Sequence, residues 1–94
     1  MVAKALRTLV ATSPEGYVAS CAAVRDADAR AEIAAIRAPT LVVAGSSDPA
    51  TPPADGHLLK EGIAGAQYVE LQASHLSNLE APEAFNTELA RFLS

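Results

Sequence analysis

The feature that most constrains this 94-residue chain is a short, uninterrupted apolar segment at residues 40–45. It reads TLVVAG and follows Pro39 directly. A β-branched run without polar alternation is typical of a strand covered on both faces, as in a parallel sheet. A second β-type segment lies at residues 67–72, after a helix-forming stretch at residues 54–63. The sequence therefore predicts a β-α-β unit, which crossover geometry makes parallel and right-handed.

The residues before this unit carry helical patterns. Residues 2–11 place apolar side chains on one stripe, and Ser13, followed by Pro and Glu, is a typical helix start. The second helix is predicted to run to about Asp26. Its apolar positions, expected on its buried face, are Tyr17, Val18, Cys21 and Val24.

Two further helices are expected. Asp28 is positioned to cap a short third helix that carries Ile33 and Ile36 and ends before Pro39, which disfavours helical geometry in the preceding residue. Pro82 is expected to open the last helix, which places four apolar side chains on one stripe. The predicted order is three helices followed by β-α-β-α.

This order predicts an α/β fold whose sheet is incomplete in this chain. Two strands cannot form an independent sheet with helices on both faces, so further strands are expected from an N-terminal portion or from a second copy in a homo-oligomer. We interpret residues 1–94 as one segment of a domain, with cap-to-core helices in residues 1–37 and the β-α-β-α unit in residues 38–94.

Composition excludes several classes of function. The net charge of −4 and the lack of a basic stripe argue against nucleic acid and anionic membranes as partners. No apolar run is long enough to cross a bilayer, and the N-terminus lacks a signal-peptide pattern, so a cytoplasmic location is expected. A single cysteine excludes an internal disulfide. The His and Asp residues show no metal-ligand spacing.

An acid and a base follow the two predicted strands at matching distances. Asp48 lies three residues beyond the first strand, and His75 lies three residues beyond the second. Because the carboxyl ends of neighbouring parallel strands meet at one edge of the sheet, we expect these side chains to lie close together. A carboxylate there can accept the imidazole Nδ1–H and leave Nε2 as a general base toward a hydroxyl nucleophile. The chain holds no G-x-S-x-G turn to supply that nucleophile.

Each of these residues also has a simpler interpretation. Asp48 before Pro49 suits an Asx turn, and His75 could cap the segment that follows it. The matched positions after two strands favour the acid–base couple over both. The remaining candidates are interpreted as non-catalytic: His57 as a surface residue, Cys21 as core, and Ser46 and Ser47 as loop residues.

The residues just described resemble a known family. Residues 38–53 resemble the acid-bearing strand and loop of α/β-hydrolases, and residues 73–82 resemble their histidine loop and final helix. More narrowly, residues 11–18, residues 21–28 and the HLSNLE sequence at residues 75–80 are similar to 3-oxoadipate enol-lactonases.

The resemblance implies the C-terminal part of an α/β-hydrolase fold and the hydrolysis of a small carboxylated enol-lactone to 3-oxoadipate in aromatic-compound degradation, without a cofactor. Asp48 would be the triad acid and His75 the general base. The nucleophilic serine and the oxyanion hole would belong to the N-terminal portion, so the isolated chain is expected to be inactive. Two alternatives stay open: another ester, lactone or carbon–carbon bond hydrolase, and a non-catalytic association module that pairs through its sheet edge.

Overall fold

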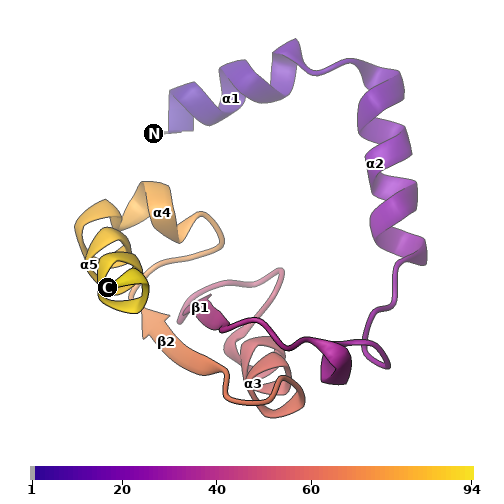
Figure 1. Cartoon of the computed structure of the whole chain (residues 1–94). Coiled ribbons are helices and arrows are strands. Elements are labelled where there is room, and N and C mark those ends of the chain that lie inside the picture. The colour runs from indigo at the N-terminus through magenta and orange to yellow at the C-terminus, as the bar shows by residue number, and fades with distance from the viewer. Residues whose placement is uncertain (1) are drawn as a thin grey trace.

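The computed structural model of the chain describes residues 2–94 and contains two strands with helices before, between and after them (Figure 1). The β-α-β-α order is confirmed, and a short helix that the sequence pattern did not predict precedes the last one. The elements are α1 (Val2–Ala11), α2 (Pro14–Asp26), the 3-10 turn η1 (Ile33–Ala35), β1 (Leu41–Gly45), α3 (Pro53–Gly62), β2 (Gln67–Leu71), α4 (Ser77–Glu80) and α5 (Pro82–Leu93).

The two strands are parallel, as predicted, with Leu41 opposite Gln67 and Gly45 opposite Leu71. Helix α3 packs against both strands, α5 packs against β2, and the strands lie between the two helices (Figure 1). Gly56 permits the close approach of α3, because a Cβ there would lie 2.9 Å from the ring of Tyr68. This β-α-β unit brings the ends of both strands, and the loops that follow them, to one edge.

The core of this unit is small and consists mainly of light side chains. The buried hydrophobic residues are Val42, Ala44, Ile63, Ala66, Leu71 and Ala73. On β1, the buried Val42 and Ala44 face α3, whereas Leu41 and Val43 are only partly covered. The sequence predicts that β1 is covered on both faces. The face toward α3 is fully covered, and the opposite face is only partly covered.

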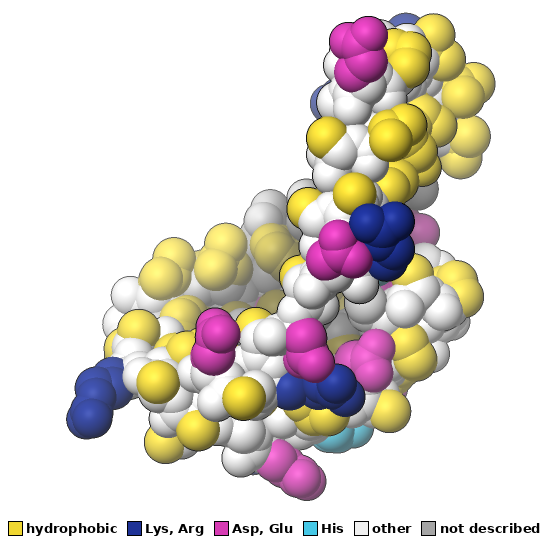
Figure 2. Space-filling view, turned by 90° about the vertical axis from the view of Figure 1, so that its right-hand side faces the viewer, with side chains coloured by type: hydrophobic (Ala, Val, Ile, Leu, Met, Phe, Trp, Pro, Cys, Tyr) yellow, Lys and Arg dark blue, Asp and Glu magenta, His cyan; other side chains and the backbone are white. Residues whose placement is uncertain are grey.

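Helices α1 and α2 form an arm that stands away from the body (Figure 1), with hydrophobic side chains along it (Figure 2). The helix boundaries agree with the sequence pattern, and the Ser13 side chain accepts a hydrogen bond from the Gly16 N–H at 3.0 Å, as a helix cap should. The predicted burial is wrong. Neither helix has a buried residue, because no element among residues 2–94 covers the stripe. Its members Tyr17, Val18, Cys21 and Val24 are all exposed, Val24 by 78%.

The third helix is shorter than the sequence predicts. Only the single turn η1 forms, and Asp28 does not cap it. Instead, the Asp28 carboxylate accepts from the Arg30 backbone N–H at 3.2 Å and pairs with the Arg30 guanidinium at 2.7 Å. Because this local pairing satisfies the carboxylate within a turn, it competes with the helical start.

Candidate active site

Asp48 lies in the turn that follows β1 and is almost fully buried, with 5% of its side chain exposed. Its Oδ1 atom accepts hydrogen bonds from the backbone N–H groups of Ala50 at 2.9 Å and Thr51 at 3.1 Å. Its own N–H donates to the carbonyl of Gly45 at 3.2 Å. The Asx-turn interpretation is therefore correct for one carboxylate oxygen, and it leaves the other available.

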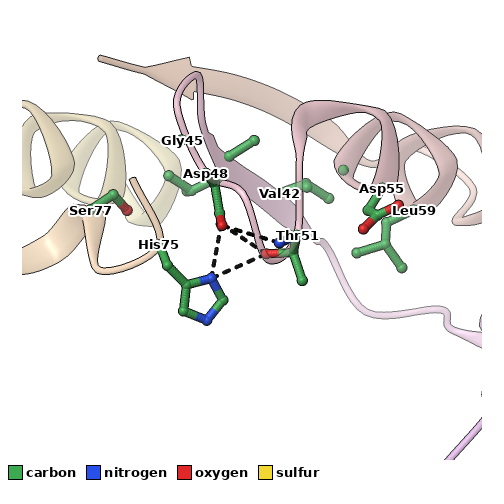
Figure 3. Close-up of a pocket in the computed structure, with 11 residues that line it drawn as sticks. Val42, Gly45, Asp48, Thr51, Asp55, Leu59, His75 and Ser77 are labelled. Atoms are coloured by element: carbon green, nitrogen blue, oxygen red, sulfur yellow. Dashed lines mark hydrogen bonds and ion pairs between the residues drawn. The ribbon is translucent and has the colours of Figure 1, made fainter. Parts of the chain in front are cut away.

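The second oxygen of Asp48 meets the histidine predicted to join it. Asp48 Oδ2 lies 2.8 Å from Nδ1 of His75, and the hydroxyl of Thr51 donates to the same oxygen at 2.8 Å (Figure 3). The His75 side chain is 57% exposed, and its other ring nitrogen points away from these partners (Figure 3). His75 does not cap the segment after it, since the cap position of α4 is Leu76. The structure thus brings the two predicted residues into direct contact and leaves Nε2 open.

Backbone and side-chain contacts fasten the histidine loop to the turn after β1. Backbone hydrogen bonds continue past the sheet, from Ser46 N–H to the Leu71 carbonyl at 2.9 Å and from Ser47 N–H to the Ala73 carbonyl at 3.0 Å. The N–H of Ser74, the residue before His75, donates to the carboxylate of Glu80 at the end of α4. These contacts fix the distance between the two loops and therefore between the acid and the imidazole.

The surroundings of Asp48 favour its charged form. Burial alone would raise the pKa of Asp48, but the hydrogen bond from His75, together with those from Thr51 and from the Ala50 N–H, outweighs burial. The net effect is to hold the pKa of Asp48 well below its usual range. Near neutral pH the group is therefore a carboxylate that accepts hydrogen bonds on both oxygens.

A cavity of about 180 Å³ lies beside the couple. Asp48, Thr51 and His75 line one part of it, and Asp55 and Leu59 of α3 line another (Figure 3). Its volume is below the range of roughly 300–1,000 Å³ that is usual for small-molecule sites. The cavity that residues 2–94 form beside the couple is therefore small for a small-molecule site.

None of the other candidates takes part in the hydrogen bonds among Asp48, Thr51 and His75. His57 is exposed, as predicted, and its ring stacks on Tyr68 with 4.2 Å between centroids. Burial, together with the Glu70 carboxylate that accepts from its hydroxyl, raises the pKa of Tyr68 to about 12. The prediction that Cys21 lies in the core is wrong, because Cys21 is exposed. Among residues 2–94 no three His, Cys, Asp or Glu side chains gather as a metal site would require, and no helix has the length and apolarity to span a membrane.

Two polar residues at the site carried no predicted role. Thr51 contacts both Asp48 and His75, and Glu80 holds the loop before His75. A signal for Thr51 exists in the sequence, because a hydroxyl residue three positions after an Asx-turn aspartate is well placed to bond its carboxylate. Glu80 has no such local signal, since its partner lies six residues earlier, across α4.

A β-α-β-α unit with an acid and a hydrogen-bonded histidine at the carboxyl edge is the arrangement of an α/β-hydrolase. The sequence family described as TAP-like protein matches residues 11–94, and the chain belongs to this family of α/β-hydrolases. It is 43% identical over 82 residues to 3-oxoadipate enol-lactonase 1 and 44% identical over 86 residues to 3-oxoadipate enol-lactonase 2, both from Acinetobacter baylyi. These matches cover 87% and 92% of this chain but only 31% and 32% of the relatives.

A solved structure agrees with these relatives. The enol-lactonase from Burkholderia xenovorans LB400 superposes with a TM-score of 0.88 at 48% identity, over 89% of this chain and 32% of that protein. The chain therefore spans about a third of the length of the proteins it matches.

Proposed function

We propose that the chain is the acid- and base-bearing C-terminal part of a serine-type α/β-hydrolase that hydrolyses a small carboxylated enol-lactone. The observation that carries the proposal is the contact of 2.8 Å between Asp48 Oδ2 and His75 Nδ1, with Nε2 left open. The similarity to two enol-lactonases supports the substrate class. Asp48 would be the triad acid and His75 the general base.

In this function Asp48 and His75 together transfer one proton in each step, through Nε2 of His75. His75 Nε2 takes the proton of a serine hydroxyl while the serine oxygen attacks the lactone carbonyl, and the carboxylate of Asp48 stabilises the imidazolium that forms. The lactone C–O bond breaks, the proton passes from Nε2 to the leaving enol oxygen, and the enol becomes a ketone. A water, activated by the same nitrogen, then releases the acyl group as a carboxylate. No cofactor takes part in these steps.

The serine and the oxyanion-hole amides would come from an N-terminal portion of the hydrolase. Two features of this chain support such a partner. The hydrogen bonds of Thr40 and Ser46 direct the even-numbered backbone groups of β1 toward β2, so those of Leu41 and Val43 lie on the outer edge, ready for another strand. The apolar residues of the α1–α2 arm offer a second surface to cover.

A fusion protein tests the proposal. The chain is joined in frame behind the N-terminal two-thirds of the Burkholderia xenovorans enol-lactonase, and 3-oxoadipate enol-lactone hydrolysis is followed. We expect turnover by the fusion and none by the isolated chain. In the fusion, His75→Gln should reduce kcat by on the order of 10⁶-fold and Asp48→Asn by on the order of 10⁴-fold, as for other hydrolytic triads. His57→Gln is the matched control and should retain activity.

The outcome also separates the alternatives. A folded fusion that hydrolyses simple esters or another lactone but not the enol-lactone would keep the mechanism and replace the substrate. A folded fusion without any hydrolase activity, beside a stable oligomer of the isolated chain, would favour the association module and contradict the proposal.

A further inference from the structure

The hydroxyl of Thr51 lies beside the Asp48–His75 contact and reaches both groups (Figure 3). Thr51 Oγ1 is 2.8 Å from Asp48 Oδ2 and 3.2 Å from His75 Nδ1, and those two atoms are themselves 2.8 Å apart. Three polar atoms from two loops thus form a closed triangle. The hydrogen bonds within this triangle determine whether Nδ1 or Nε2 of the neutral His75 ring carries the hydrogen.

Only one arrangement of protons satisfies all three atoms. The Asp48 carboxylate is ionised and carries no hydrogen, so the Thr51 hydroxyl donates to Oδ2 and turns a lone pair toward Nδ1. A hydrogen on Nδ1 then has two acceptors, Asp48 Oδ2 and Thr51 Oγ1. With the hydrogen on Nε2 instead, lone pairs of Nδ1 and Oδ2 would face each other at 2.8 Å. The hydroxyl could donate to only one of them.

Thr51 also holds the carboxylate by its other oxygen. Its backbone N–H donates to Asp48 Oδ1 at 3.1 Å, while its hydroxyl donates to Oδ2, so a single residue hydrogen-bonds both carboxylate oxygens. Two fixed points resist rotation of the carboxylate about its bond to Cβ. The 57% exposed His75 ring, in contrast, has Asp48 and Thr51 as its hydrogen-bond partners among residues 2–94.

We propose that Thr51 is a positioning residue of this site, whose hydroxyl orients the Asp48 carboxylate and keeps the His75 proton on Nδ1, so that Nε2 presents its lone pair. The catalytic meaning of this role rests on the proposed function. The hydrogen-bond role itself does not, because it can be measured in the chain without any turnover.

The test is the ratio of the two neutral tautomers of His75, read from the ¹⁵N shifts of its ring nitrogens at a pH where the imidazole is neutral. Wild type should favour Nδ1–H. Thr51→Val keeps the β-branched shape and the backbone N–H but removes the hydroxyl, and should lower the Nδ1–H to Nε2–H ratio roughly 2–10-fold, the value of one net hydrogen bond. Thr51→Ser restores the hydroxyl and should restore the ratio.

Two comparisons make the result specific. Thr12→Val removes a hydroxyl that donates to the Thr8 carbonyl in α1, and should leave the His75 ratio unchanged. His57 is the internal reference, since its tautomers should not respond to any Thr51 variant. Thr51→Ala provides a second hydroxyl-free variant if Thr51→Val unfolds.

A wild-type ratio in a folded Thr51→Val or Thr51→Ala variant would overturn the proposal, and so would a lowered ratio in a folded Thr51→Ser variant. The fusion protein adds an independent readout, in which Thr51→Val should lower kcat with little change in KM. An inactive fusion would contradict the proposed function and leave the tautomer result standing.

Discussion

Gly45, the last residue of β1, should be indispensable for the geometry of the site. A Cβ at this position would lie 2.2 Å from the carbonyl oxygen of Ser74 and 2.5 Å from that of Ala73. Both are backbone atoms, so no side-chain rotation can relieve the contact. Ordinary van der Waals contact begins at 3.4 Å, and the Gly45→Ala variant must therefore move the histidine loop away from β1 by about 1 Å.

That displacement reaches the acid–base couple directly, because Ser74 precedes His75. A shift of about 1 Å would stretch the Asp48–His75 contact from 2.8 Å beyond the 3.2 Å at which such hydrogen bonds normally end. Overpacking of this kind costs about 1–3 kcal/mol. For a chain of this length each kcal/mol lowers Tm by roughly 4–8 °C.

Thermal unfolding followed by circular dichroism, together with the His75 tautomer ratio, measures both effects. Gly62→Ala is the matched control. Its Cβ would lie 2.3 Å from the side-chain end of Ile33, which can rotate away, so this variant should be tolerated better than Gly45→Ala. A Gly45→Ala variant with the wild-type Tm and tautomer ratio would refute the argument that this close backbone approach sets the distance between the loops.

Three further predictions follow from the structure. Glu80→Ala removes the carboxylate that accepts from the Ser74 N–H and should cost roughly 0.5–1.5 kcal/mol in urea unfolding, with a larger spread of His75 ring signals. Ile63→Ala, at a side chain only 4% exposed, should cost about 2–5 kcal/mol, whereas Val24→Ala on the arm should change stability by at most about 0.5 kcal/mol; equal losses would contradict the burial. The lowered pKa of Asp48 contributes stability at every pH above its unfolded-state value near 4, and this contribution is lost as the pH falls below that value. Acid unfolding curves should therefore separate wild type from Asp48→Asn at neutral pH and converge at low pH.

Much of the secondary structure could be predicted because its signals are local. Ser13 and the proline after it place the start of α2 to the residue, and the TLVVAG run places β1 to within one residue. The meeting of Asp48 and His75 is not local, yet it follows from topology. Parallel neighbours end at one edge, so equal offsets from two strands bring side chains together.

The incorrect or missing predictions have a different origin, since they concern which groups contact one another in the folded chain. An amphipathic pattern reports that a stripe is suited to burial, but not what covers it, and Val24 is 78% exposed for that reason. The contacts of Thr51 and Glu80 depend on the path of a loop in three dimensions, which periodicity does not encode. Asp28 shows the remaining failure, in which a local ion pair with Arg30 replaces an expected helix cap.

Three exposed features of the chain support one interpretation of it. Three features have no partner among residues 2–94: the apolar stripe of the arm, the outer edge of β1 and the Nε2 atom of His75. An association module would use the first two and would have no need of the third. The buried carboxylate of Asp48 accepts four hydrogen bonds, one of them from the exposed imidazole of His75. If its role were only packing, a neutral side chain would fill the same place at lower desolvation cost. The polar contacts at the strand ends therefore favour a hydrolytic part over a structural one, and the variants at Thr51 and His75 separate the two by experiment.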